Sequence, residues 1–320
     1  MNKNNVVYLF PGQGAQYSGM AMDFLESDAV KSLFKMASEV FGKDVKELLQ
    51  SDADTLKRTD VSQPAITVAN LAAAEFLKSK GFSPAACAGF SLGEYSALVC
   101  AGVISASDCL RLIKARGEAM QKTCDHLREL SGGDASAAPG MAAIVGLAPA
   151  QIEELIAKWS NEGLKDLYAA NINSPKQVAV SGTAAALAEA ETRFKETGAK
   201  RVIRLQVAGP FHSPLMADAT EAFRPTLESV TFRDPVTVVF SNVTGKKINS
   251  GDEAKKLALL QITSPVRWVE EEAAIAACGC EACLEVGPGK VLQGLWKDAT
   301  PADGGIPVFA AGTAEDISKL

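Results

Sequence analysis

The 320-residue sequence contains no hydrophobic run long enough to cross a membrane and no run of basic residues. Its longest apolar stretches, such as Val6–Phe10 and Ala273–Ala277, are far shorter than the roughly 20 residues of a membrane-spanning helix. Lys and Arg are interspersed with Asp and Glu, and the net charge is −6. Binding to nucleic acid requires a concentrated basic face. We therefore expect neither a membrane segment nor a nucleic acid partner.

The N-terminal residues Met1–Asn5 lack the basic and apolar regions of a signal peptide, so we expect a cytoplasmic location. The cysteine count is seven, and an odd count in a long cytoplasmic chain favours reduced thiols over a disulfide framework. Only Cys278, Cys280 and Cys283 are clustered. A zinc site there lacks a fourth ligand nearby, so small buried thiols are the preferred interpretation and no metal is expected.

The composition is that of a globular protein, and the length suits a large domain carrying a smaller one. Val6–Phe10 and Ala85–Phe90 are predicted as short buried strands, with a helix at Ile66–Lys80 that Gly81 closes. Strand, helix and strand in this order indicate a parallel α/β sheet. Later strands are expected at Val236–Ser241, Cys283–Val286 and Val308–Ala311.

The middle of the chain begins with a Gly- and Ala-rich linker, Ser131–Gly140. The elements predicted after it are, in order, strand Met141–Val145, helix Ala148–Trp159, strands Leu167–Ala170 and Val178–Ser181, helix Ala184–Thr197 and strand Val202–Val207. This order matches the ferredoxin-like pattern. The predicted fold is thus a large, parallel-sheet, hydrolase-like α/β domain (residues 1–134 and 207–320) with an inserted ferredoxin-like small domain (135–206).

Gly89-Phe-Ser-Leu-Gly93 fits the G-x-S-x-G nucleophile elbow. A strand leads into it, and a helix leaves through Glu94 to Cys100. A sharp strand-to-helix turn needs small flanking residues, and it places the serine oxygen at a positive helix N-terminus. Ser91 is therefore the candidate nucleophile.

A serine hydroxyl needs a base, and the sequence has only two histidines. His126 lies in a polar stretch before the linker and is expected to be solvated. His212 lies in a Gly- and Pro-containing turn after the strand Val202–Val207, where Ser213 could cap the next helix and Pro214 suits its first position. His212 is the candidate base, although a purely structural histidine is the alternative.

The Gly-rich loop Pro11–Gln16 directly follows the first strand. It lacks the Lys-Ser/Thr of a P-loop and the full G-x-G-x-x-G of a dinucleotide site. Acyl-transfer enzymes place an oxyanion-hole amide in such a loop, beside the amide of the residue after the nucleophile. Gln13 and Leu92 are the candidate donors.

Arg116 lies in the middle of an apolar stripe on a helix that opens near Ser105, with Asp108 completing a capping box. A guanidinium on a core-facing stripe is unfavourable unless it is paired. It could pair with a buried acid, or it could await a carboxylate on a ligand, which it can bind bidentately.

Six motifs in order resemble the malonyl-CoA:acyl carrier protein transacylase family of bacterial fatty acid synthesis over nearly the whole chain. They are Pro11–Gln16, Gly89–Gly102, Arg116-Gly117, Asn171–Pro175, Phe211–Met216 and Glu285–Lys290. The sequence departs from the family at Phe90, where a polar residue is usual, and in the longer linker at 131–140.

The resemblance implies that Ser91 accepts the malonyl group and that His212 acts as general base and then general acid. It implies that Arg116 binds the free malonyl carboxylate, and that a main-chain carbonyl, here that of Gln261, orients the histidine. Gln13 and Leu92 would hold the oxyanion.

The resemblance also places Asn171 and Asn173 at the cleft, and Phe211 is the variant that the family associates with malonyl rather than bulkier groups. The implied partners are malonyl-CoA and acyl carrier protein, with no bound cofactor and a monomeric chain. Lys290 and Lys297 are candidates for contacts with the acidic carrier protein.

Two other classes share some of these features. A serine hydrolase or thioesterase would use the same elbow and histidine, but it normally adds a buried Asp or Glu and leaves Arg116 without a purpose. A non-catalytic subunit that binds thioesters or carrier protein would not require Ser91, His212 and Arg116 together.

Overall fold

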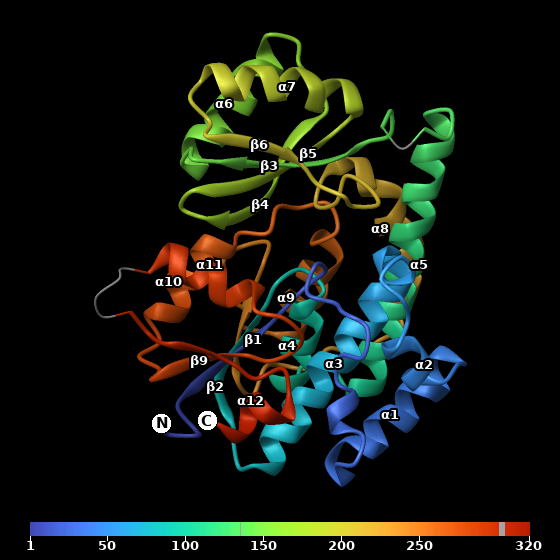
Figure 1. Ribbon diagram of the computed structural model, residues 1–320, viewed down its shortest axis with the longest axis vertical. Coiled ribbons are helices and arrows are strands. Elements are labelled where there is room, and N and C mark those ends of the chain that lie inside the picture. The colour runs from blue at the N-terminus through green and yellow to red at the C-terminus, as the bar shows by residue number, and fades with distance from the viewer. Residues whose placement is uncertain (135, 301–304) are drawn as a thin grey trace.

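The strands β1 (Val6–Phe10), β2 (Pro84–Gly89) and β9 (Ala282–Glu285) of the large sheet lie in the lower half of the view in Figure 1. The computed structural model describes residues 1–134, 136–300 and 305–320. The sheet order is β10 (Val308–Ala310), β9, β1, β2, β7 (Val238–Ser241) and β8 (Lys246–Lys247). All neighbours pair in parallel except β7 and β8. The predicted parallel α/β sheet is confirmed.

Helices cover both faces of this sheet, and the central strand β1 is therefore buried on both sides. Val6, Tyr8 and Phe10 enter one core cluster, and Val7 and Leu9 enter another. The first cluster draws on α1 (Asp28–Phe41), α2 (Val45–Leu49), α3 (Thr59–Ser79), α4 (Gly93–Cys100), α5 (Ala106–Leu130), α8 (Ala217–Glu228), α9 (Gly251–Leu260) and α12 (Ala314–Ser318). The second draws on α10 (Trp268–Ala276) and α11 (Val291–Ala299). Short 3₁₀ helices span η1 (Met22–Phe24), η2 (Thr55–Lys57) and η3 (Pro214–Met216).

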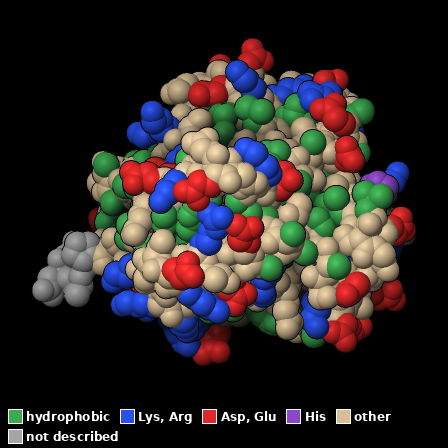
Figure 2. Space-filling view, turned by 90° about the horizontal axis from the view of Figure 1, so that it is seen from above, with side chains coloured by type: hydrophobic (Ala, Val, Ile, Leu, Met, Phe, Trp, Pro, Cys, Tyr) green, Lys and Arg blue, Asp and Glu red, His purple; other side chains and the backbone are tan. Residues whose placement is uncertain are grey.

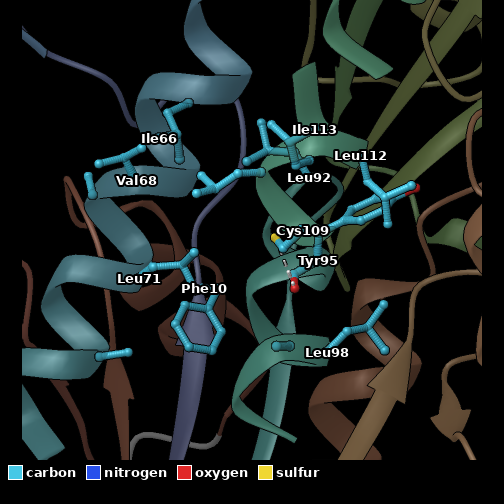
Figure 3. Packing of buried hydrophobic residues seen from close by; sticks show 14 of the residues in the cluster. Phe10, Ile66, Val68, Leu71, Leu92, Tyr95, Leu98, Cys109, Leu112 and Ile113 are labelled. Carbon is cyan, nitrogen blue, oxygen red and sulfur yellow. Dashed lines mark hydrogen bonds between the residues drawn. The ribbon is translucent and has the colours of Figure 1, made fainter. Parts of the chain in front are cut away.

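The packing beneath α4 fixes the elbow that precedes this helix. Figure 3 shows Leu92, Tyr95 and Leu98 in one hydrophobic cluster with Leu112 and Ile113 of α5. All five side chains are almost fully buried. The residue after Ser91 is therefore anchored in the core, which fixes the position of its main-chain amide.

A second, antiparallel sheet lies above the first, with α6 (Pro149–Asn161) and α7 (Ala184–Glu196) on its outer face (Figure 1). Its order is β4 (Leu167–Ser174), β5 (Gln177–Gly182), β3 (Gly140–Val145) and β6 (Arg201–Arg204). The β-α-β-β-α-β sequence is the predicted one, and the elements share a core of their own. The predicted limits 135–206 stay a prediction, since residue 135 lies outside the described residues.

Main-chain hydrogen bonds join this second sheet to a loop of the large domain. Ile172 donates to the carbonyl of Val266 at 2.8 Å, and Val266 donates to that of Ala170 at 2.8 Å. Val266 lies in the loop that follows α9 and begins with Gln261. The strand β4 thus adds rigidity to a loop that carries a candidate site residue.

Several predicted boundaries are wrong. The helix predicted from Ile66 begins at Thr59, because Pro64 is accommodated inside the helix instead of preceding it. The strand predicted at Leu167–Ala170 continues to Ser174, with register shifts near Asn171. The strand predicted at Val202–Val207 ends at Arg204, because only Leu205 of the following residues still pairs with β3.

The surface carries both signs of charge. In the view from above, acidic and basic side chains are interspersed (Figure 2), as the sequence indicates. Within the described ranges, no helix is long and apolar enough to span a bilayer.

Candidate active site

The nucleophile elbow lies at the carboxyl end of β2, and its glycines are required by close backbone contacts. A Cβ on Gly89 would collide with the main chain of Gly93, and one on Gly93 would collide with the carbonyl of Phe10. Ser91 adopts a positive φ of 53°, which costs an ordinary residue about 1–2 kcal/mol. The local fold is that of the predicted strand–turn–helix elbow.

The Gly-rich loop packs backbone to backbone against this elbow. Phe90 donates its amide to the carbonyl of Phe10 at 2.9 Å, and a Cβ on Gly12 would collide with the carbonyl of Phe90. Among the described residues, no acceptor pairs with the amide of Gln13 or of Leu92. Two free amides flank the serine, which is what an oxyanion hole requires. Their role stays a prediction.

Ser91, His212 and Gln261 come together although they lie far apart in the sequence. Ser91 Oγ lies 2.8 Å from His212 Nε2, and His212 Nδ1 lies 2.9 Å from the main-chain oxygen of Gln261. A carbonyl oxygen only accepts, so Nδ1 carries the proton and donates it. In the neutral ring, Nε2 is then the acceptor for the serine hydroxyl. The pair has the geometry of an activated nucleophile.

The environment of His212 favours the neutral ring. Its side chain is buried, and burial together with the positive charge of Arg116 lowers its pKa to about 4, although the bond to Gln261 opposes the shift. His212 is therefore a free base at neutral pH. The φ of 56° at His212 is also positive, like that of Ser91.

The turn around His212 differs from the prediction in one detail. Ser213 does not cap the following helix, which is the 3₁₀ helix η3. Its hydroxyl donates instead to the carbonyl of Pro210 at 2.6 Å. Pro214 does occupy the first helical position. The serine thus closes the turn that presents His212.

Arg116 is fully buried in α5, and it has neutral partners. Its terminal nitrogens donate to Gln63 Oε1 at 2.7 Å and to Gln261 Oε1 at 3.0 Å. Within the described part of the chain, no carboxylate lies within salt-bridge distance of Arg116, and its Nε finds no acceptor. The buried-acid alternative is thus not observed. Two of the five guanidinium N–H groups are used, so donors remain for a ligand carboxylate.

Glu94 is the carboxyl group whose charge acts on Arg116. Burial raises its pKa to about 7, while hydrogen bonds from Asn242 and Gln261 and the charge of Arg116 oppose the rise. Burial therefore disfavours the ionised form of the carboxyl group that acts electrostatically on the buried Arg116. This leaves an electrostatic need for an anion.

The remaining predicted residues lie around this centre. Asn171 and Asn173 both lie on β4 beside its register shifts, while Ile172 between them enters the core of the second sheet. Asn173 Oδ1 is buried and finds no partner within the described chain. Phe211 is buried, and its carbonyl accepts a hydrogen bond from Ser181 Oγ at 2.5 Å. This contact links β5 to the residue before His212.

Phe90, where the family usually has a polar residue, packs edge-on against Trp268 with ring centroids 5.5 Å apart. Its side chain is partly buried and packs against the core cluster formed with α10 and α11. His126 lies on α5 with its side chain exposed, in agreement with the predicted solvated histidine. All seven cysteines are free thiols, and the described residues include no group of His, Cys, Asp or Glu arranged for a metal ion.

Two site residues escaped the sequence analysis. Gln63 binds Arg116, but it precedes the predicted start of its helix. Asn242 accepts a hydrogen bond from the amide of Ser91 at 2.7 Å. A signal for Asn242 existed, because it follows the strand predicted to end at Ser241, and ligand sites of parallel sheets form at the carboxyl ends of strands.

Comparisons with known proteins agree with this site. The model of the acyl transferase domain family matches residues 7–313. The malonyl CoA-acyl carrier protein transacylase of Haemophilus influenzae is 40% identical over 293 residues, which cover 90% of each chain.

Solved structures give the same result. The transacylase of the same name from Coxiella burnetii has a TM-score of 0.88 at 31% identity and covers 99% of this chain and 96% of its own. A malonyl-transacylase solved with its type II PKS acyl-carrier protein has a TM-score of 0.88 at 33% identity, covering 99% and 98%. The elbow, the histidine and these matches together show that the chain belongs to the malonyl CoA-acyl carrier protein transacylase family of acyl transferases.

Proposed function

We propose that this enzyme transfers a malonyl group from malonyl-CoA to the phosphopantetheine thiol of acyl carrier protein, through an ester on Ser91. The observation that carries the proposal is Arg116, a buried cation with neutral partners that is linked through Gln261 to the Ser91–His212 pair. The names of the relatives, and the related structure that holds a carrier protein, support the same substrates. The product would feed fatty acid synthesis.

In the first half-reaction, His212 Nε2 takes the proton of Ser91 Oγ as this oxygen attacks the thioester carbonyl. The amides of Gln13 and Leu92 stabilise the oxyanion of the tetrahedral intermediate. When the C–S bond breaks, the proton on Nε2 passes to the leaving sulfur, and CoA departs as a thiol. His212 is then neutral again, held by Gln261.

The second half-reaction reverses these roles. The carrier-protein thiol gives its proton to His212 Nε2 and attacks the ester carbonyl. Collapse of the intermediate breaks the bond to Ser91 Oγ, which regains the proton. The cycle needs no metal or bound cofactor. The acyl donor malonyl-CoA and the acyl acceptor, the carrier-protein thiol, use the same site in turn.

Arg116 provides the selectivity in this proposal. The malonyl carboxylate binds to its unused N–H groups, whereas an acetyl group would leave the buried guanidinium without an anion. Asn171, Asn173 and Phe211 line the acyl pocket from the side of the second sheet. Lys290, which precedes α11, and Lys297 in the last turn of this helix contact the acidic carrier protein.

A serine hydrolase is the second candidate, since it shares the Ser–His pair. Its usual buried carboxylate on the histidine is replaced here by the carbonyl of Gln261. We further propose that the enzyme works as a monomer in the cytoplasm, where its seven free thiols would stay reduced. The molar mass of the purified enzyme, measured by sedimentation, tests whether it is a monomer.

The decisive experiment is the intact mass of the enzyme after brief incubation with malonyl-CoA, compared with Ser91→Ala. We expect a gain of one malonyl group that is absent in the variant and discharged by carrier protein. Release of CoA without a trapped adduct would favour the hydrolase. Neither adduct nor CoA would exclude malonyl-CoA as the donor and leave a binding role.

A further inference from the structure

Asn242 holds both sides of the elbow that carries Ser91. It follows β7 directly and is fully buried. Its Oδ1 accepts from the amide of Ser91 at 2.7 Å, while its Nδ2 donates to the carbonyl of Gly89 at 2.7 Å. One side-chain amide therefore pairs with the carbonyl of Gly89 and with the amide of Ser91, the strained residue. The amide of Ser91 has no other partner in the described chain.

The orientation of this amide is fixed by groups whose roles cannot change. The second hydrogen of Nδ2 goes to Glu271 Oε1 of α10 at 2.7 Å. A main-chain N–H only donates and a carbonyl only accepts, so the amide cannot rotate by 180° without losing its bonds to Ser91 and Gly89. Every hydrogen-bonding site of the Asn242 side chain is used, because Oδ1 also accepts from Gln261 Nε2 at 3.2 Å.

The same network reaches the base. Gln261 Nε2 also lies 3.0 Å from the carbonyl oxygen of Ser91, so its two hydrogens are shared among this oxygen, Asn242 Oδ1 and Glu94 Oε2. The main-chain oxygen of Gln261 accepts from His212. Glu94 Oε2 accepts from the main-chain amide of Asn242 at 2.7 Å and from Gln261 Nε2 at 3.1 Å. The buried side-chain amide of Asn242 is thus connected by hydrogen bonds to the main chain of Ser91 and, through Gln261, to His212. Asn242 touches neither the serine hydroxyl nor the imidazole.

We propose that Asn242 is a positioning residue for acyl transfer: its amide holds Ser91 in the left-handed conformation that aims Oγ at His212 Nε2 and leaves the Leu92 amide free for the oxyanion. The inference deepens the proposed function and rests on it for the identity of the acyl donor. Because a displacement of about 1 Å can cost about 100-fold in rate, loss of this support is measurable as chemistry rather than as binding.

The test compares Asn242→Ala and Asn242→Asp with the native enzyme in rapid-quench acylation by malonyl-CoA, normalised to folded protein. We expect Asn242→Ala to lower the maximal acylation rate by about 100-fold. The malonyl-CoA concentration for half-maximal rate should stay within about threefold, because Arg116 is untouched. Asn242→Asp keeps the acceptor for the Ser91 amide but loses both donors, so its rate should also fall at least about tenfold.

Ser241→Ala is the matched control. It removes a buried hydroxyl from the preceding residue, where it accepts from the amide of Val243 at 3.2 Å, and this hydroxyl forms no hydrogen bond with residues 89–93 of the described chain. We expect its acylation rate per folded molecule to stay native. If Asn242→Ala loses thermal stability but acylates like this control, Asn242 is merely structural and the proposal fails. Should Asn242→Ala not fold, a native rate in the near-isosteric Asn242→Asp would overturn it.

A fluorophosphonate that labels activated serines is measured in parallel, since it needs the elbow and base but no malonyl group. Slow labelling of both Asn242 variants, with native labelling of Ser241→Ala, supports the positioning role whatever the donor. Failure of the native enzyme to react with malonyl-CoA, combined with fast labelling by the fluorophosphonate, would count against the proposed function alone. Equal labelling of all variants would overturn the positioning role alone.

Discussion

At the scale of single residues, the site concentrates backbone strain and buried charge where the chemistry is proposed. Ser91 and His212 are two of the four non-glycine residues with positive φ in the described chain. Such residues persist only where the surroundings over-determine them. Here the hydrogen bonds of Asn242 and the turn closed by Ser213 do so. The strain positions the nucleophile and the base before any substrate arrives.

The pH dependence of acylation follows from the lowered pKa of His212, which is about 4 instead of the ordinary 6.5. The base form is required, and it is present above the pKa and lost as the pH falls through it. We expect the rate of Ser91 acylation to change by less than about twofold between pH 8 and pH 5.5 and to fall only near pH 4. Rapid-quench acylation after brief pH jumps measures this. Half-maximal rate near pH 6.5 would contradict the burial argument.

Replacing Arg116 should alter donor selectivity rather than the nucleophile. Arg116→Ala removes the proposed partner of the malonyl carboxylate, so acylation by malonyl-CoA should fall by about 100-fold or more. Acylation by acetyl-CoA should fall far less, and the ratio of the two rates is the measurement. Arg111→Ala on the exposed face of the same helix, where Arg111 pairs with Asp108, is the control. An unchanged ratio in Arg116→Ala would show that Arg116 does not read the carboxylate.

At the scale of elements, the site depends on how closely the ends of β1 and β2 approach each other. The loop after β1 and the first turn of α4 meet backbone to backbone, with Gly93 at the contact. The motif glycines are therefore determined by contacts between elements and not by the turn alone. The N-terminus of α4 directly follows the elbow, so its positive end lies next to Ser91.

Gly93→Ala should disrupt this contact. The added Cβ would collide with the carbonyl of Phe10, so either the loop or the helix must move. We expect Ser91 acylation to fall by at least about 100-fold, because the Gln13 and Leu92 amides move apart. The control is Gly294→Ala in α11, where an added Cβ meets nothing nearby. This control should keep native activity and gain up to about 1 kcal/mol of stability. Full activity in Gly93→Ala would refute the packing argument.

At the scale of the whole molecule, the helix α10 brings buried acids between the two sheets. Glu272 Oε1 accepts from Trp268 Nε1 at 2.8 Å, and its other oxygen finds no partner in the described chain. Burial raises the pKa of Glu272 to about 8. The folded state therefore holds a proton that the unfolded chain releases above its pKa of 4.5. Its contribution to stability is complete below pH 4.5 and is lost as the pH rises through about 8.

Thermal unfolding between pH 7 and pH 9 tests this linkage. From this residue alone, the free energy of unfolding should fall by about 1–2 kcal/mol across the interval. Glu272→Gln keeps an acceptor for Trp268 but cannot ionise, so the loss in this variant should be smaller by that amount. Identical slopes in the variant and the native enzyme would mean that Glu272 ionises normally. Glu315→Gln, which alters an exposed acid, is the control.

The sequence by itself determined the local features of this protein. The period of apolar residues placed the central strands and put Arg116 on a core-facing helix stripe, and the glycine pattern placed Ser91 in its elbow. These patterns are readable because each depends on neighbours within a few residues. The scarcity of histidine led to His212, and family resemblance led to Gln261.

Only the tertiary structure decided which groups meet. The partners of Arg116 are two glutamines, one of them 145 residues away, and Asn242 lies 151 residues from the serine it supports. Ser213 closes a turn instead of capping a helix because Pro210 offers it a carbonyl at close range. A hydrogen bond depends on separations of a few tenths of an ångström, and these are set by packing of the whole core rather than by any local pattern.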